Sequence, residues 1–178
     1  RAHIEHWCDA YDVNRHDSDR QTPGVLLGRF VNDGYGGQGG NPWVLITAAL
    51  ASLLYQGAQD ARWKPAMTPE ALTAWRAALN LPDFSGTTAD FVAQGDAVMW
   101  RLHSHVVQRD GSLHLYEQID QHTGLQYNAK DLTWSYTEVL AALAERELAI
   151  GGGDAEQWLP RRLQEAGSEA GGDGALHV

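Results

Sequence analysis

The fold is decided by the stretch NPWVLITAALASLLY, residues 41–55. An asparagine followed by proline is a frequent helix start, with Asn41 as the N-cap and Pro42 in the first helical position. After the proline, only Thr47 and Ser52 are polar. A helix that is apolar on nearly every side has to be surrounded by other parts of the protein. We therefore expect this helix to be the most deeply buried element of the chain.

Four further helices are expected around it. Segment 2–11 has apolar residues at spacings of three and four, and the polar run 14–23 ends it. Thr68-Pro69 repeats the cap-and-proline start of a helix that Pro82 stops. Two later helices, over about 88–109 and 131–147, each carry one apolar stripe: Phe91, Val98, Leu102 and Val106 in the first, and Leu132, Tyr136, Val139, Leu140 and Leu143 in the second. The absence of alternating strands and helices predicts an all-α fold.

Composition limits the class of protein. Of the 178 residues, 43% are hydrophobic and 20% are charged, which excludes a disordered chain, and no run of eighteen apolar residues is present to span a bilayer. The net charge of −10 repels phosphate backbones and anionic lipids, so we expect neither nucleic acid nor membrane as a partner. The chain begins with Arg1, so we expect a processed product or a piece of a longer protein. We expect one domain in residues 1–150 and a low-complexity, disordered tail in residues 151–178.

The sequence gives little reason to expect a metal or a phosphate cofactor. His103 and His105 are two residues apart, so on a helix they point about 200° away from each other and cannot share one ion. The single cysteine, Cys8, has no partner for an intrachain disulfide, and neither a CxxC nor an HExxH motif is present. The glycine-rich stretch 34–40 lacks the Gly-Lys-Ser/Thr signature of a phosphate-binding loop, and a loop with positive φ angles explains it better.

Three local features remain as candidates for chemistry. Glu117 lies in the long connection 110–128, where neither helical periodicity nor a cap accounts for a carboxylate, although a solvated loop glutamate is the alternative. Arg29 and Asp33, four residues apart, form either a surface ion pair or a guanidinium that its carboxylate orients to grip a ligand. Trp134 lies about 200° from the apolar stripe of its helix, so the core does not claim it.

Three motifs in order carry a resemblance to a known family. They are Gly28-Arg29-Phe30 with Asp33 and a glycine-rich stretch into Asn41-Pro42-Trp43, then Tyr116-Glu117-Gln118, then AKDLTWSY at residues 129–136. Together they resemble the C-terminal third of the catalytic domain of glucoamylases, the inverting glycoside hydrolase family 15, over roughly residues 7–147. The departures from the family pattern are Phe30, Val31 and Asn32 in place of Tyr-Pro-Glu, and Asn128 where a serine often supports the base.

The resemblance implies a fold, an activity and a set of site residues. The fold would be part of an (α/α)6 barrel, and its pocket would remove glucose from the non-reducing ends of starch-like α-glucans or maltooligosaccharides. Glu117 would be the general base that activates water. The residues implied to bind substrate are Arg29, Asp33, Trp43, Gln118 and Trp134.

We therefore predict a glucan 1,4-alpha-glucosidase of the inverting type, which needs no metal or organic cofactor because carboxylates perform its proton transfers. The family's general acid would lie upstream of Arg1. We accordingly expect residues 1–178 alone to be inactive, the missing N-terminal part of the same domain to be a partner, and the protein to be secreted. Two alternatives stay open: a non-catalytic sugar-binding or structural fragment, and a related (α/α)6 hydrolase of trehalose or dextran ends.

Overall fold

The computed structural model describes residues 3–30, 32–37, 39–64, 66–107 and 111–151. Over these residues the chain forms six helices and one short hairpin, which confirms the prediction of an all-α fold. The elements are α1 (His3–Ala10), α2 (Asp12–Asp19), α3 (Val44–Trp63), α4 (Pro69–Leu79), α5 (Thr88–Val106), β1 (Gln118–Ile119), β2 (Gln126–Tyr127) and α6 (Thr133–Gly151). The predicted tail lies outside the described residues from position 152 onward.

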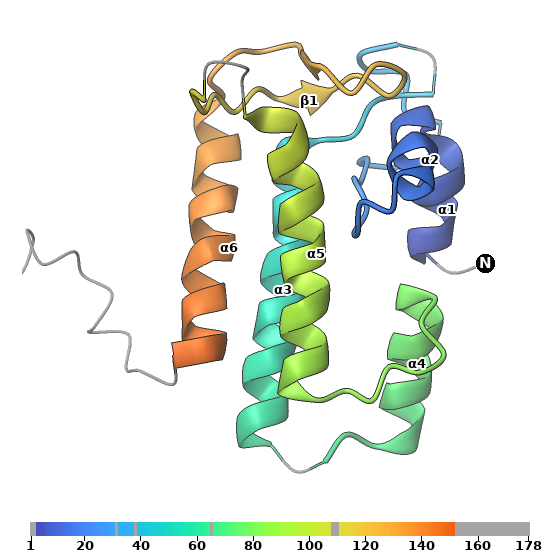
Figure 1. Cartoon of the computed structure of the whole chain (residues 1–178), viewed down its shortest axis with the longest axis vertical. Helices are drawn as coiled ribbons and strands as arrows, with labels where there is room; N and C mark the ends of the chain where they lie inside the picture. The colour runs from blue at the N-terminus through green and yellow to red at the C-terminus, as the bar shows by residue number, and fades with distance from the viewer. Residues whose placement is uncertain (1–2, 31, 38, 65, 108–110, 152–178) are drawn as a thin grey trace, which may run out of the picture.

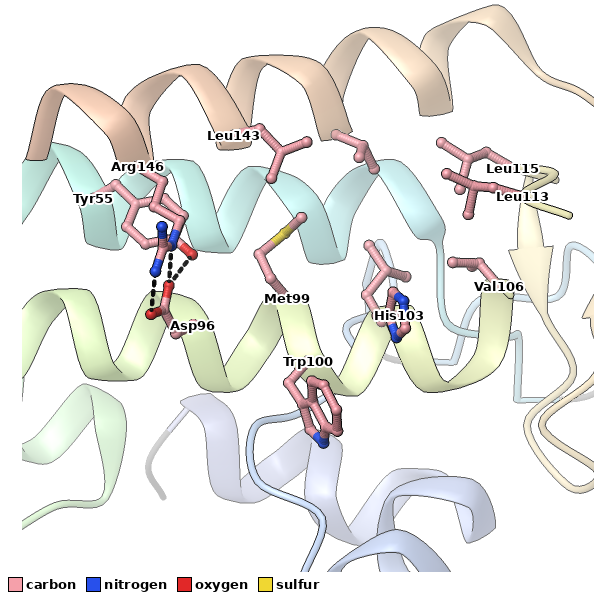
Figure 2. A pocket seen from close by; sticks show the side chains of 12 residues that line it. Tyr55, Asp96, Met99, Trp100, His103, Val106, Leu113, Leu115, Leu143 and Arg146 are labelled. Carbon is pink, nitrogen blue, oxygen red and sulfur yellow. Dashed lines mark hydrogen bonds and ion pairs between the residues drawn. The ribbon is translucent and has the colours of Figure 1, made fainter. Parts of the chain in front are cut away.

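Helix α3 is the central element of the structure. It packs along its length against both α5 and α6, whereas α5 and α6 make few contacts with each other. In Figure 1 these three helices run side by side, and α1, α2 and α4 lie beyond α5, away from α6. The hairpin and its flanking loops cover one end of the three helices. Because α5 and α6 make few contacts with each other, a cavity remains between them (Figure 2).

The central helix begins later than the sequence pattern indicates. The N-cap is Trp43, in an extended conformation, and the helix starts at Val44, so the prediction that Asn41 caps it is wrong. The physical reason is a competing set of bonds. The Asn41 Oδ1, the atom that would accept from a helix amide, accepts from the Gln121 amide at 3.0 Å, while Nδ2 donates to the Gly36 carbonyl and to Gln118 Oε1, both at 3.1 Å. The deep burial of α3 is as expected along most of its length, with Leu53 an exception at 51% exposed.

The polar run 14–23 is predicted to end the first helix, and α1 does end at Ala10, but most of the run lies in a second helix, α2, that the sequence pattern does not predict. Two of its polar side chains point inward. Asn14 is fully buried, donates to the carbonyls of Trp7 and Leu26, and accepts from the Leu26 amide. Asp17 is also buried, against α5. Hydrophobic periodicity does not reveal a helix whose buried face is largely polar, so the sequence pattern does not predict α2.

The apolar stripe predicted for the last helix is only partly correct. The residues of α6 that are fully buried are small ones: Ser135, Ala142 and Ala149. These small side chains let α6 pack closely on α3. By contrast, Leu140 is 64% exposed and Leu143 is 44% exposed, so these two members of the predicted apolar stripe are not buried in this chain. The stripe of α5 is confirmed, because Phe91, Val98, Leu102 and Val106 are all buried.

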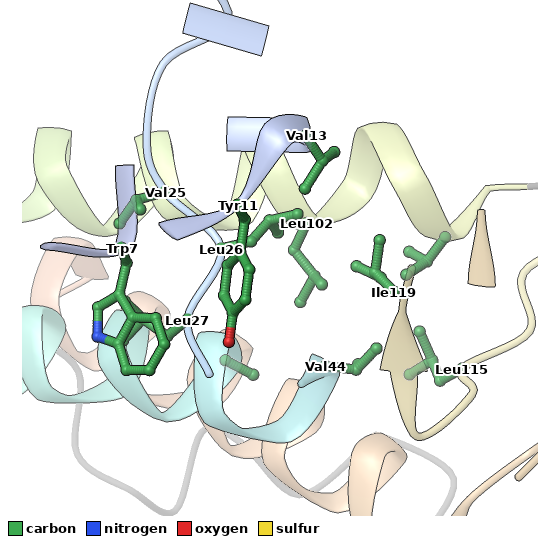
Figure 3. Close-up of a cluster of buried hydrophobic side chains, with 12 residues drawn as sticks. Trp7, Tyr11, Val13, Val25, Leu26, Leu27, Val44, Leu102, Leu115 and Ile119 are labelled. Atoms are coloured by element: carbon green, nitrogen blue, oxygen red, sulfur yellow. The ribbon is translucent and has the colours of Figure 1, made fainter. Parts of the chain in front are cut away.

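Two groups of buried side chains hold the helices together, and the first supports the hairpin end. Figure 3 shows this group, in which Trp7 of α1 and Tyr11, the residue between α1 and α2, stack on each other and lie beside residues 25–27. Leu102 of α5 and Ile119 of β1 complete the contact between α1 and the hairpin. The second group, around Tyr55 and Phe91, fills the opposite end. No helix in the described ranges combines the length and hydropathy needed to cross a membrane.

Candidate active site

The predicted pair Arg29 and Asp33 forms a two-pronged ion pair in the glycine-rich segment. Arg29 Nε lies 2.7 Å from Asp33 Oδ2, and Nη2 lies 2.8 Å from Oδ1. Asp33 is 2% exposed and also accepts from the Tyr35 amide at 3.0 Å. The hydrogen bonds from Arg29 hold the pKa of Asp33 below its usual value. Of the two explanations for this pair, the geometry favours a guanidinium fixed in direction by a buried carboxylate.

Aromatic rings surround the same guanidinium. The carbon at its centre lies 4.6 Å from the Trp43 ring, 4.9 Å from the Tyr35 ring and 5.4 Å from the Phe30 ring. Phe30 and Tyr35 are about half exposed, whereas Trp43 is 6% exposed. Such cation–π contacts add to the restraint that Asp33 provides. The result is a rigid cation with an exposed aromatic border, an arrangement suited to a neutral polyhydroxylated ligand.

Glu117, the predicted base, is brought to this cluster by the hairpin. Its backbone amide donates to the Ala129 carbonyl at 2.9 Å, and its carbonyl accepts from the Val44 amide at 3.2 Å. The side chain is half-buried, and its two oxygens lie 3.2 and 3.5 Å from the Tyr35 hydroxyl. Glu117 also acts electrostatically on Arg29, whose pKa is raised chiefly by the hydrogen bonds to Asp33. Residues far apart in sequence therefore meet in one cluster.

Gln118 faces the interior. It is fully buried, and its Oε1 accepts from Asn41, which in turn binds the backbone of Gly36 and Gln121. Gly36 has a φ of +86°, and a Cβ at this position would lie 2.3 Å from Gln118 Oε1. The loop that carries Asp33 and Tyr35 is thus seated on the strand that follows Glu117. In this structure Gln118 supports the loop, and its predicted contact with substrate stays a prediction.

Trp134 lies at the start of α6, at a distance in sequence from the Arg29 cluster. It is 59% exposed, and its Nε1 donates to Glu138 at 3.0 Å. The next residue, Ser135, is buried and donates to the Tyr116 carbonyl at 2.8 Å, which ties α6 to the residue before Glu117. The exposed Trp134 ring therefore lies on a helix that is hydrogen-bonded to the residue before the candidate base. Its exposure agrees with the expectation that Trp134 is not part of the core.

Asn128 occupies the position where the family pattern often has a serine. Its φ is +68°, in the left-handed region, which asparagine adopts more readily than most residues. The carbonyl of the following residue, Ala129, accepts from the Glu117 amide. The left-handed backbone conformation at this turn gives a physical reason for an asparagine at position 128. The turn positions the Ala129 carbonyl that accepts from the Glu117 amide.

The two histidines considered as metal ligands point to different surroundings. His103 stacks on Trp100 with the ring centres 5.7 Å apart, whereas His105 lies 2.7 Å from Asp17 and 2.9 Å from the Gly124 carbonyl. The described part of the chain contains no group of three or more His, Cys, Asp or Glu side chains able to hold a metal ion.

Tyr35 and Asn41 are site residues that the sequence motifs do not predict. Tyr35 contacts both Arg29 and Glu117, and Asn41 joins the loop to the hairpin. For Tyr35 a signal was available, because an aromatic residue two positions after Asp33 lies within reach of the same ligand. For Asn41 the signal was misleading, because the residue before Pro42 matched a helix cap.

Comparisons with known proteins agree with the motifs. The sequence profile of glycosyl hydrolases family 15 matches residues 5–144. The chain is 33% identical over 161 residues to a glucoamylase from Blastobotrys adeninivorans, covering 79% of this chain and 25% of that protein. It is 30% identical over 169 residues to the intracellular sporulation-specific glucoamylase of Saccharomyces cerevisiae, covering 80% of this chain and 30% of that protein.

The solved glucoamylase from Saccharomycopsis fibuligera superimposes with a TM-score of 0.63 at 26% identity, covering 83% of this chain and 34% of that chain. Glucoamylases of this family have an (α/α)6 barrel, so the predicted fold class is confirmed. The chain spans about a quarter to a third of the length of the relatives it matches. The family profile, the relatives and the arrangement of Arg29, Asp33 and Glu117 lead to one conclusion: this chain belongs to glycosyl hydrolases family 15.

Proposed function

We propose that this chain forms part of a glucoamylase that releases glucose from the non-reducing ends of starch-like α-glucans, with inversion at the anomeric carbon. The single observation that carries the proposal is the position of Glu117, a half-buried carboxylate beside the fixed Arg29 guanidinium and the Tyr35 hydroxyl. The family membership and the glucoamylase relatives support it.

Glu117 acts as the general base in this proposal. It accepts a proton from a water molecule as the water oxygen attacks the anomeric carbon and the glycosidic bond breaks. Arg29 binds sugar hydroxyls, and its direction is fixed by Asp33. The exposed rings of Tyr35 and Trp134 offer flat faces to the sugar.

The general acid is a second carboxyl group, which has to donate a proton to the departing oxygen. Asp33 is unsuited to this role, because Arg29 stabilises its ionised form and lowers its pKa. We therefore assign the acid to the part of the family 15 domain that this chain does not span. Residues 1–150 would be the C-terminal portion of that domain, and the missing N-terminal part its partner.

The experiment joins this chain to the part of the Saccharomycopsis fibuligera glucoamylase that it does not match. We expect the chimaera to release glucose from maltotriose, and we expect the 178-residue chain alone to release none. Proton NMR during the first minutes should detect β-glucose. A folded chimaera that releases no glucose, or one that releases α-glucose first, would overturn the proposal. Trehalose and dextran are tested as further substrates, and a preference for either would indicate the alternative of a related (α/α)6 hydrolase.

The role of Glu117 has its own test in the chimaera. Glu117→Gln should lower kcat by about 10²–10⁴-fold, with a smaller effect on KM, because a positioned base is lost while binding is kept. Glu70→Gln, in the first turn of α4 and exposed, is the matched control and should leave kcat unchanged. Near-normal turnover of Glu117→Gln would remove this residue from the mechanism.

We also propose that the protein is secreted, as a glucoamylase that acts on external starch would be. One relative is named as intracellular, so the family alone does not fix the compartment. Separate assays of glucose-releasing activity in culture medium and in washed cells of the source organism would decide between the two locations.

A further inference from the structure

The first turn of α6 holds the segment that leads into Glu117. The Leu115 amide donates to the Tyr136 hydroxyl at 3.2 Å, and the Ser135 hydroxyl donates to the Tyr116 carbonyl at 2.8 Å. The start of α6 lies at the hairpin end of the three long helices (Figure 1), so its side chains reach the residues immediately before the candidate base.

The peptide group between Tyr116 and Glu117 is held on both sides. Its carbonyl accepts from Ser135, and its amide, which belongs to Glu117, donates to the Ala129 carbonyl at 2.9 Å. Because a peptide group is planar, these two hydrogen bonds together fix the orientation of the plane. The orientation of this plane determines the backbone angle φ of Glu117, and with it the direction of the Cα–Cβ bond that leads to the carboxylate.

The Ser135 hydroxyl is buried and is used outside its own helix. A serine or threonine within a helix often donates to the carbonyl four residues earlier, as the exposed Thr137 does to Thr133 at 3.0 Å. Ser135 is 0% exposed and donates instead to Tyr116, 19 positions away in sequence. Close packing of α6 explains a small residue at position 135 but not a hydroxyl, because α6 has alanine at its other fully buried positions.

We propose that Ser135 is a positioning residue for the general base: through the Tyr116 carbonyl it keeps the Glu117 carboxylate directed at the attacking water. The proposal rests on the proposed function, in which Glu117 accepts a proton from that water. Catalytic groups have to be held within about 0.5 Å and about 10–20° of their productive geometry, and a displacement of about 1 Å lowers a rate by about 10²-fold. Without the Ser135 hydroxyl, the peptide group before Glu117 keeps one of the two hydrogen bonds described above.

The test uses the chimaera with the part of the Saccharomycopsis fibuligera glucoamylase that this chain does not match. In Ser135→Ala, kcat on maltotriose should fall by about 10–10²-fold while KM changes by less than about twofold, because the base is displaced and the sugar-binding groups stay in place. Thr137→Ala is the matched control: it removes an exposed hydroxyl two positions along the same helix and should leave kcat unchanged. A kcat of Ser135→Ala within about twofold of the parent, or an equal fall in Thr137→Ala, would overturn the proposal.

A double-mutant cycle separates positioning of the base from a general loss of structure. A residue that acts through the base has little effect once the base is removed, whereas a residue that supports the whole fold lowers the residual activity as well. In the Glu117→Gln background, Ser135→Ala should therefore lower kcat by less than about twofold. A fall as large as in the parent chimaera would mean that Ser135 supports the structure in general, and it would overturn the proposal.

Hydrogen–deuterium exchange tests the placement of Glu117 without hydrolysis. In Ser135→Ala the Glu117 amide should exchange at least about tenfold faster, because its peptide group is held on one side only, whereas Thr137→Ala should leave the rate unchanged. Mass spectrometry of peptides that contain Glu117 measures both rates in the chimaera. Unchanged exchange in Ser135→Ala would overturn the proposal whether or not the chimaera is active. Faster exchange in a chimaera that releases no glucose would support the placement of Glu117 by Ser135 and would contradict the proposed function alone.

Discussion

Replacing Arg101 with methionine is expected to destabilise the fold by about 3–5 kcal/mol. The side chain is 1% exposed, and burial lowers the pKa of its guanidinium. Its Nε donates to the Pro23 carbonyl at 3.0 Å, its Nη1 lies 3.3 Å from Asp17 Oδ2, and its Nη2 donates to the Thr22 carbonyl. Methionine fills much of the same space but donates nothing. The buried Asp17 carboxylate then loses a cationic partner, and two carbonyl groups lose their donor.

The assay is urea unfolding followed by near-UV circular dichroism. With a slope of about 2 kcal/mol per molar urea, the expected loss lowers the midpoint by about 1.5–2.5 M. Arg146→Met is the matched control, because this arginine also pairs with an aspartate but is about a third exposed. Its loss should be about 1 kcal/mol or less. Equal losses in the two variants would refute the argument that burial of the guanidinium sets the cost.

Three further outcomes are expected. The hydrogen bonds from Arg146 lower the pKa of Asp96, so the contribution of Asp96 to stability is present above pH about 4 and is lost as the pH falls through the lowered pKa. In Asp96→Asn the melting temperature should therefore fall less steeply with decreasing pH in this acidic range. An unchanged pH dependence would contradict the assignment. In the chimaera, Arg29→Lys should weaken inhibition by a sugar-shaped amine by about tenfold, because lysine lacks the planar fork, and equal inhibition would reduce the pair with Asp33 to a salt bridge. Gly36→Ala should lower the free energy of unfolding in urea by about 2 kcal/mol or more, because the new Cβ would clash with the buried Gln118 side chain. Gly37→Ala, which has open space around it, should lower it by less. The reverse order would contradict the contact.

Of two similar cap-and-proline signals for a helix start, one is correct and one is wrong, and the reason lies in tertiary contacts. Thr68-Pro69 was predicted to open a helix, and Thr68 does accept from the Ala71 amide at 3.2 Å at the start of α4. Asn41-Pro42 has the same form, but the Asn41 side-chain oxygen accepts from the distant Gln121 amide at 3.0 Å in place of a helix amide. A local signal predicts a helix start only where no distant group competes for the capping side chain.

The candidate site, like the helix starts, was predictable from the sequence only in part. The spacing of Arg29 and Asp33 indicated a pair, but only the structure distinguishes a buried carboxylate from an exposed one. Glu117 was placed by the family resemblance, since its loop position alone allowed a solvated residue. The contact of Tyr35 with Glu117 joins residues 82 positions apart, and no local pattern reports such a distance.

That separation also determines when the site can form during synthesis. Ribosomes add about 5–20 residues per second, so the Glu117 side chain follows Tyr35 out of the ribosome after about 4–16 s. Until then the loop around Tyr35 has neither the Glu117 carboxylate nor the Gln118 side chain on which it rests. A nascent chain interrupted between these two residues would therefore expose an arginine, an aspartate and three aromatic rings without their support, and it would be a substrate for chaperones and proteases.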